Sequence, residues 1–158
     1  MTDIDPVFED LSVPEDSLIL IVDDNAQNLE LLQAYLEDLG CRTQIAHDGA
    51  QAIEMAKLET PDVVVLDVMM PRLSGFQVCE KLKKDPQTAA VPIVMVTALN
   101  EISDVERAIE AGADDFLTKP VQRLELLARV KSQINVKGME RRLQSAIERM
   151  REIGKSET

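Results

Sequence analysis

Runs of consecutive apolar residues alternate along this chain with segments in which apolar residues recur every three or four positions. The continuous runs have the length of buried strands, and weaker strands lie between them. The pattern predicts five strands, at Leu18–Val22, Arg42–Ala46, Asp62–Leu66, Pro92–Val96 and Asp115–Thr118. It predicts helices at Asn28–Leu39, Gly49–Leu58, Gly75–Lys84, Ile102–Ala111 and from Val121 onward. Gly40 and Gly112 follow two of these helices in the position of a C-cap.

This order of elements predicts the fold class. Strands that alternate with helices form βαβ units, and these build a parallel sheet covered by helices on both faces. We therefore expect an α/β protein, a flavodoxin-like (βα)5 three-layer sandwich with strand order 2-1-3-4-5 and an extended C-terminal helix. The expected organisation is a flexible acidic tail at 1–17, one domain at 18–136 and a helical extension at 137–158.

Polar residues follow the predicted strands. Asp23 and Asp24 follow the first strand, Asp67 the third, Thr97 the fourth and Lys119 the fifth. Each alone has an ordinary explanation as a helix cap or a surface residue. In a parallel sheet, however, all the carboxyl ends of the strands lie along one edge, and ligands bind there at the point where the strand order reverses. In the order 2-1-3-4-5 this point lies between strands one and three, so we expect the three aspartates to meet.

Three neighbouring carboxylates need a counter-charge. At an effective dielectric constant of about 20, two like charges about 4 Å apart repel by roughly 4 kcal/mol. Oxygen ligands without histidine or cysteine favour a hard ion, and Mg²⁺ suits few carboxylates, several waters and a phosphoryl oxygen. Thr97 and Lys119 supply a hydroxyl and a mobile positive charge for an anion beside the metal. The sequence therefore predicts phosphoryl transfer with Asp67 as the nucleophile.

The composition of the chain argues against some classes of binding partner. The 158 residues carry a net charge of −12, and 19 acids stand against 11 bases in residues 18–136. This acidity argues against direct binding of nucleic acid, which depends on lysine and arginine at phosphates. Since no apolar run approaches a membrane span, we expect no membrane partner. Cys41 and Cys79 fit neither a metal site nor a disulfide framework, which favours a reducing, cytoplasmic location.

Four segments together resemble the receiver domain of two-component response regulators. They are IVDDN (21–25), VVVLDVMMPRLSG (63–75), VMVTA (94–98) and AGADDFLTKP (111–120), and the resemblance covers about residues 18–136. It implies that a histidine kinase or a phosphotransfer protein donates a phosphoryl group to this chain. The chain itself is then a phosphoacceptor that promotes transfer to its own aspartate and its later hydrolysis, and not an enzyme acting on other substrates.

The resemblance also assigns roles at the metal site. It implies that Asp67 is the phosphoacceptor, that Asp24 binds Mg²⁺ directly and that Asp23 binds it through water. The backbone carbonyl of Met69 completes the protein ligands, and Mn²⁺ is an alternative ion. Ser74 stands where an aspartate is frequent in the family, at a position outside the chemistry.

A second group of residues resembles the family's switch. The resemblance implies that Thr97 is the switch hydroxyl, that Lys119 contacts the phosphoryl group and that Phe116 occupies the place of the switch aromatic. The resemblance implies a cis peptide bond between Lys119 and Pro120. Met69 and the apolar residue 99, two positions beyond Asp67 and Thr97, flank the path of water to the acyl phosphate, and their apolar character predicts a long-lived phosphorylated state.

Other classes of protein remain as alternatives. A haloacid-dehalogenase-like phosphatase needs a second aspartate where this chain has Met69, and a flavodoxin-like cofactor binder needs a phosphate loop where it has DDNAQN. A receiver-like module that signals without phosphate is a third alternative. The chain could also be the N-terminal part of a longer regulator with an enzymatic output domain.

The region after the predicted domain has a heptad pattern. The positions of its apolar residues alternate by three and four, at Val136, Met139, Leu143, Ala146, Met150 and Ile153, which we call the heptad stripe. The alternatives are an amphipathic helix folded on its own domain and a dimeric coiled coil. We expect output through a downstream protein or through self-association, by the heptad stripe and by the face formed by the fourth helix, the fifth strand and the fifth helix.

Overall fold

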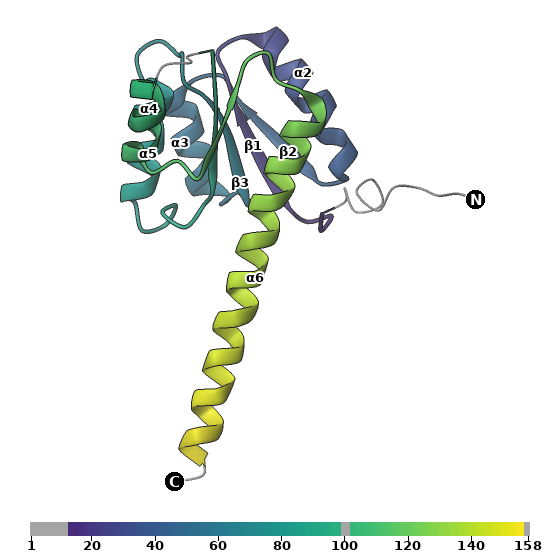
Figure 1. Ribbon diagram of the computed structural model, residues 1–158, viewed down its shortest axis with the longest axis vertical. Helices are drawn as coiled ribbons and strands as arrows, with labels where there is room; N and C mark the ends of the chain where they lie inside the picture. The colour runs from purple at the N-terminus through teal and green to yellow at the C-terminus, as the bar shows by residue number, and fades with distance from the viewer. Residues whose placement is uncertain (1–12, 99–101, 157–158) are drawn as a thin grey trace, which may run out of the picture.

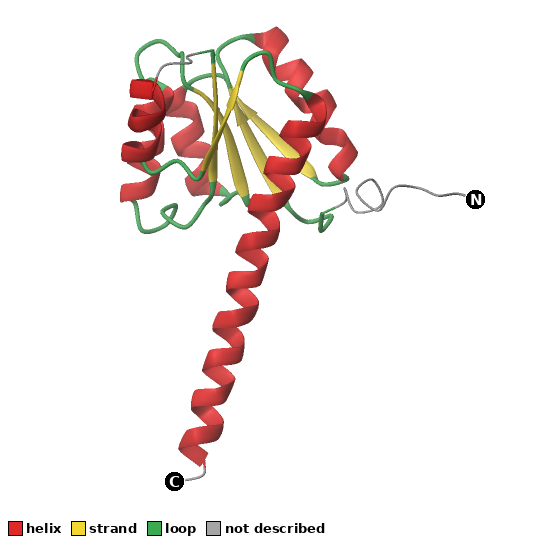
Figure 2. Ribbon diagram, viewed as in Figure 1, coloured by secondary structure: helices red, strands yellow, loops and turns green. Residues whose placement is uncertain are grey.

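A computed structural model describes residues 13–98 and 102–156 of the chain. Helices and strands alternate, as Figures 1 and 2 show. The strands are β1 (Leu18–Val22), β2 (Arg42–Ala46), β3 (Val63–Asp67), β4 (Ile93–Thr97) and β5 (Asp115–Thr118). The helices are α2 (Ala26–Leu36), the 3₁₀ turn η1 (Glu37–Leu39), α3 (Gly49–Leu58), α4 (Gly75–Lys84), α5 (Ile102–Ala111) and α6 (Arg123–Ser156).

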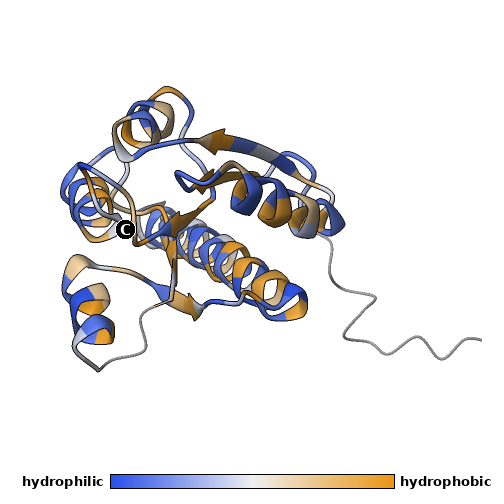
Figure 3. Cartoon of the chain, turned by 90° about the horizontal axis from the view of Figure 1, so that it is seen from above, coloured by the Kyte–Doolittle hydropathy of each residue, from blue (hydrophilic) through white to orange (hydrophobic). Residues whose placement is uncertain are grey.

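The described strands form one parallel sheet in the order β2-β1-β3-β4-β5. Helices α3, α4 and α5 cover one face of the sheet, and α2 and the first half of α6 cover the other (Figure 1). In Figure 3 the strands are largely hydrophobic, whereas the helices carry hydrophobic and hydrophilic residues side by side. The predicted flavodoxin-like fold, its strand order and its long C-terminal helix are confirmed.

The two hydrophobic clusters follow from the alternation of side chains along the strands. On β1, Leu20 and Val22 face α3 and α4, whereas Ile19 and Ile21 face α2 and α6. All five residues of β1, β3 and β4 are buried, as expected for central strands covered on both faces. This burial explains why the sequence shows continuous apolar runs there and not an alternating pattern.

Several element boundaries differ from the prediction by one or two residues. Helix α2 begins at Ala26, because the Asn25 side chain accepts the N–H of Asn28 and caps the helix. Strand β3 includes Asp67, since the ladder to β4 continues to the Asp67–Val96 pair. Strand β4 begins after Pro92, which has no N–H to donate to a ladder.

The predicted tail at 1–17 is too long at its C-terminal end. Residues 1–12 lie outside the described residues. Val13, however, is 7% exposed and packs in the cluster under α2, and its N–H donates to the carbonyl of Leu39 at 3.2 Å. The packed part of the chain therefore includes Val13. No local pattern indicated this, because a single valine between a serine and a proline has no period.

Helix α6 runs without interruption through Gly138 and leaves the body of the molecule (Figure 1). Leu126, Val130 and Ile134 pack on the sheet. Where the helix leaves the body, Lys137 Nζ donates to the carbonyl of Ala90 at 3.2 Å. From this point onward, the larger side chains of the heptad stripe are between 46% and 70% exposed: Val136, Met139, Leu143, Met150 and Ile153.

Candidate functional site

The carboxyl ends of β1, β3 and β4 bring the predicted site residues to one edge of the sheet. The registers pair Val22 with Leu66 and Asp67 with Val96. Asp23, directly after β1, therefore lies beside Asp67 at the end of β3. The point where the strand order reverses lies between these two strands, as the sequence predicted.

Asp23, Asp24 and Asp67 form a compact carboxylate group. One oxygen from each lies within 4.8 Å of the others, and among the described residues this is the group of acidic, histidine or cysteine side chains arranged to hold a metal ion. Asp23 is 1% exposed and Asp67 is 3% exposed, whereas Asp24 is exposed. The N–H of Asn25 donates to Asp23 Oδ1 at 2.9 Å and fixes that carboxylate.

Burial and mutual repulsion set the charges of this group. Burial raises the pKa of Asp67, the charge of Asp23 raises it further, and Lys119 opposes both effects. Burial also raises the pKa of Asp23, against the hydrogen bond from Asn25 and the charge of Lys119. The Lys119 ammonium lies 3.1 Å from Asp67 Oδ1, so one lysine balances part of the charge of two buried carboxylates.

The carboxylate oxygens of this group suit a hard divalent cation. Asp23 Oδ2 is buried and accepts no hydrogen bond, whereas Asp67 Oδ1 is buried with the Lys119 ammonium 3.1 Å away. Buried carboxylate oxygens without donors are costly unless a cation is present. Met69 lies in the turn that follows, with its side chain 60% exposed. These oxygen ligands are of the type that Mg²⁺ prefers.

Glycine at position 75 closes the turn beyond Asp67. A Cβ atom there would lie 2.4 Å from the carbonyl oxygen of Asp67 and 2.7 Å from the Cα of Val68. The Gly75 N–H donates to the carbonyl of Val68 at 2.9 Å. Ser74 then begins α4 with a capping box to Gln77. The sequence indicated a turn at Gly75, but the close contact of α4 with the end of β3 appears only in the structure.

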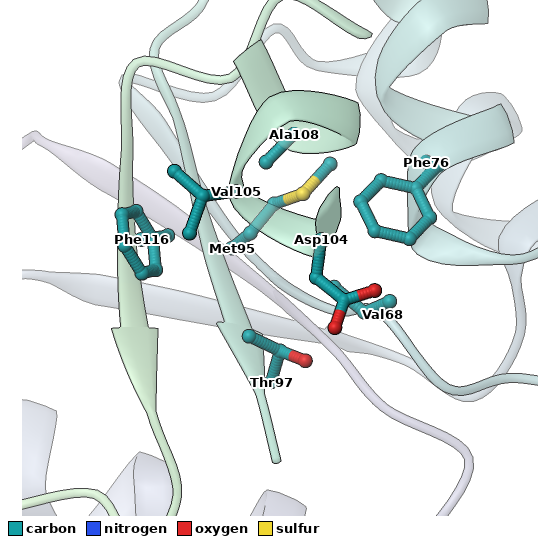
Figure 4. A pocket seen from close by; sticks show the side chains of 8 residues that line it. All are labelled: Val68, Phe76, Met95, Thr97, Asp104, Val105, Ala108 and Phe116. Atoms are coloured by element: carbon teal, nitrogen blue, oxygen red, sulfur yellow. The ribbon is translucent and has the colours of Figure 1, made fainter. Parts of the chain in front are cut away.

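Thr97 and Phe116 line the same small cavity of about 10 Å³ (Figure 4). The other lining residues are Val68, Phe76, Met95, Asp104, Val105 and Ala108. Phe116 is half-buried, and Thr97 is 7% exposed. The Asp104 carboxylate points into the space next to Thr97, and sequence reasoning missed it because only the packing of α5 on β4 brings it there.

The segment after β5 is tied to the end of β4. The Lys119 N–H donates to the carbonyl of Thr97 at 2.7 Å. The peptide bond between Lys119 and Pro120 is cis, the form that the resemblance implied. The structure thus brings Asp23, Asp67, Thr97 and Lys119 to one edge. Residue 99, which the sequence placed beside the path of water, lies outside the described residues.

The fold and this edge of the sheet are those of a receiver domain, and comparison with known sequences agrees. The sequence profile of the response regulator receiver domain matches residues 19–131. The chain belongs to this family. It is the receiver domain of a two-component response regulator, and the predicted family is confirmed.

Two relatives with known roles are longer than this chain. The chain is 47% identical over 114 residues to the response regulator PleD of Caulobacter vibrioides, covering 72% of this chain and 25% of PleD. It is 42% identical over 114 residues to the DNA-binding dual master transcriptional regulator RpaA of Synechocystis, covering 72% of this chain and 47% of RpaA. The chain therefore spans half or less of the length of these relatives.

Solved structures show the same fold. A putative response regulator from Chloroflexus aurantiacus superimposes with a TM-score of 0.73 at 34% identity, covering 76% of this chain and 98% of that one. The receiver domain of a sensor histidine kinase from Pseudomonas aeruginosa has a TM-score of 0.71 at 32% identity, with the same coverage of 76% and 98%. That structure has a magnesium ion coordinated in its active site cleft. In the described part of our chain, no helix is long and apolar enough to cross a membrane.

Proposed function

We propose that Asp67 accepts a phosphoryl group from a phosphohistidine of a histidine kinase or a phosphotransfer protein. An oxygen of the Asp67 carboxylate forms the new O–P bond while the P–N bond to the histidine breaks. The observation that carries this proposal is the placement of a buried aspartate, 3% exposed, beside two further carboxylates and 3.1 Å from a lysine ammonium. A structural ion pair would not need the two additional acids.

Mg²⁺, with Mn²⁺ as an alternative ion, fits the oxygen ligands of this group. Asp24 would bind it directly, Asp23 through water, and Asp67 and the Met69 carbonyl would complete the protein ligands. The ion supplies charge neutralisation between the carboxylates and the incoming phosphoryl oxygens. Lys119, 3.1 Å from Asp67, would contact the phosphoryl group, and Thr97 would donate its hydroxyl to a phosphoryl oxygen.

Labelling with a small phosphodonor and Mg²⁺ tests the assignment. We expect a hydroxylamine-sensitive acyl phosphate in the wild type and none in Asp67→Asn. Asp62→Asn is the matched control, because Asp62 directly precedes the opposite end of β3 and asparagine can still accept the N–H of Leu18. Labelling of Asp67→Asn at the wild-type level would contradict the proposal. Asp24→Asn should weaken Mg²⁺ binding more than Asp23→Asn.

The phosphorylated state would persist for long. Met69 carries no group that could orient or activate an attacking water molecule. We expect the acyl phosphate of the wild type to decay more slowly than that of Met69→Asn combined with Leu99→Glu. The measurement is the decay of the labelled protein after the phosphodonor is removed, and faster decay in the wild type would contradict this reasoning.

The output would be a change in self-association or in binding of a downstream protein. The surface proposed for it consists of α5, β5 and α6, which continues into the heptad stripe. Phosphoryl binding would draw Thr97 toward the site, and Phe116 would turn into the space next to it. Sedimentation with and without beryllofluoride, together with binding of the candidate partner, tests this output. An unchanged mass with an unchanged partner profile would refute it.

The location and the activity of the whole protein are separate proposals. The acidic body, with a net charge of −12 for the chain, is unsuited to binding nucleic acid itself, and a cytoplasmic location suits a partner of histidine kinases. Because the chain spans half or less of PleD and RpaA, a further output region joined through α6 is a second candidate arrangement. In that arrangement α6 would transmit the state of the receiver.

A further inference from the structure

The heptad stripe of α6 points away from the body of its own receiver. Val130 and Ile134 pack on the sheet, and Met139 and Leu143 each follow one of them by nine residues. Nine residues at about 100° each place side chains on opposite sides of a helix. Met139 and Leu143 are 64% and 62% exposed. The helix therefore does not fold its stripe onto its own domain.

The shape of the stripe favours another helix as its partner. Its residues occupy the a and d positions of the heptad, and among the flanking e and g positions only Ile147 carries an apolar side chain, so the apolar face is close to the narrow seam of a coiled coil. An interfacial membrane helix needs a broader apolar face. Going upstream, the same line of positions carries Ser132, Arg129 and Glu125, which are exposed, so the seam begins where α6 leaves the body. Two chains can therefore pair along the seam without displacing their receivers.

The charges beside the seam distinguish the two orientations of such a pair. With Val136 at position a, the g positions are Asn135, Arg142 and Arg149, and the e positions are Glu140, Ile147 and Gly154. Two antiparallel helices that overlap along the whole stripe bring g positions together, so Arg142 of each chain faces Arg149 of the other. Two parallel helices in register bring each g position to the following e position, so Arg142 faces Ile147 and Arg149 faces Gly154. Like charges meet only in the antiparallel pair.

We propose that a second copy of this chain binds along the heptad stripe, parallel and in register. The repulsion between Arg142 and Arg149 disfavours the antiparallel pair, and Asn135 faces Glu140 of the other chain as a hydrogen-bond donor. Both receivers then lie at the same end of the helix pair. Their β5–α6 edges, where Arg129 Nη1 pairs with Asp115 Oδ1 at 3.0 Å, face each other. The inference rests on the proposed output by self-association and adds the partner and its orientation.

A disulfide between two copies of α6 at the heptad stripe distinguishes a parallel pair from an antiparallel one. Met139→Cys in a Cys41→Ser background places the same residue of two parallel chains side by side, within reach of a disulfide. In the antiparallel pair the two copies of residue 139 lie eleven residues apart along the axis, about 16 Å. Cys79 need not be replaced, because its side chain is buried. We expect Met139→Cys to form a disulfide-linked dimer under mild oxidation, and Ser145→Cys, at an outward position c, to form little.

Charge reversal is the second test. Arg142→Glu puts a carboxylate opposite Arg149 in the antiparallel pair and so favours that orientation. We therefore expect a lower yield of the Met139→Cys disulfide-linked dimer. We also expect a mixed disulfide to form between Met139→Cys and Met150→Cys chains. Arg151→Glu makes the same change in charge at position b, outside the seam, and should leave the Met139→Cys disulfide unchanged. An equal effect of both variants would overturn the role of Arg142.

Sedimentation over a range of concentrations tests the association itself. We expect a species of twice the 17.6 kDa chain mass, lost in Leu143→Glu. A monomer at every concentration, a dimer that survives Leu143→Glu, or binding of the monomer to vesicles of phosphatidylcholine and phosphatidylglycerol through the stripe would each overturn the proposal. Labelling of Asp67 is measured on the same samples. Loss of labelling with an intact dimer would refute only the phosphoacceptor assignment, and labelling of a pure monomer would refute only the dimer.

Discussion

The crowded carboxylates should make the protein less stable when no divalent cation is present. Asp23 and Asp67 are both buried, and burial raises the pKa of each. A raised carboxyl pKa means that the folded state binds protons more tightly than the unfolded state. The ionised carboxylates therefore reduce the free energy of unfolding at neutral pH. This loss disappears as the pH falls toward the ordinary pKa of aspartate.

Asp23→Asn removes one of these charges and keeps the shape of the side chain. The separation of at most 4.8 Å implies a repulsion between Asp23 and Asp67 of about 3.5 kcal/mol or more at an effective dielectric constant of about 20. The substitution also removes the attraction between Asp23 and Lys119, and it leaves a neutral acceptor for the Asn25 N–H. Both losses offset part of the stabilisation gained by removing the repulsion. We expect a net stabilisation of about 1–2 kcal/mol in EDTA at pH 7.

Urea unfolding in EDTA measures the difference. Asp24→Asn is the matched control, because Asp24 is exposed and solvent screens its charge. The advantage of Asp23→Asn should shrink as the pH falls from 7 toward the ordinary pKa of aspartate, since the raised pKa of Asp23 and Asp67 means that the folded wild type binds protons before the unfolded chain does. Saturating Mg²⁺ should stabilise the wild type, by about 1.4 kcal/mol at ten times the dissociation constant, and the variant less.

Two results would contradict this reasoning. If Asp23→Asn were less stable than the wild type in EDTA, the hydrogen bond from Asn25 would outweigh the repulsion. If Mg²⁺ stabilised wild type and variant equally, Asp23 would have no part in holding the ion.

Three further substitutions test the neighbouring structure. Gly75→Ala should lower the free energy of unfolding by about 3 kcal/mol or more, measured by urea unfolding, because its Cβ would clash with the Asp67 carbonyl 2.4 Å away; a neutral effect would show that the turn is not tightly packed. Gly138→Ala should increase the stability of α6 by about 1 kcal/mol in thermal unfolding followed by circular dichroism, since no atom lies within 4 Å of the added Cβ, and a loss of helix would contradict this. Thr97→Ala should abolish the change in NMR signals of the Phe116 ring on addition of beryllofluoride, because a cavity of about 10 Å³ holds no ring until Thr97 moves; a wild-type response would separate the two residues.

Much of the fold could be read from the sequence because it depends on local and periodic signals. The continuous apolar runs of β1, β3 and β4 reflect burial on both faces of a parallel sheet, and handedness and connection rules leave few topologies for such an order. The site followed from the same step, since Asp23, Asp67 and Thr97 come at or directly after strand ends. The heptad stripe was also visible, because its spacing is a property of the sequence alone.

Tertiary packing decided what has no local signal. The burial of Val13 under α2, the approach of Gly75 to the end of β3 and the place of Asp104 beside Thr97 each join segments that are distant in the sequence or set by the angle of a helix. The direction of α6 is likewise a tertiary property. The sequence by itself determined which residues form the strands, the carboxylate group and the stripe. Only the packing of α6 on the sheet determined that its stripe points outward, because a helix turns its remaining faces to solvent once its apolar face is buried against the body.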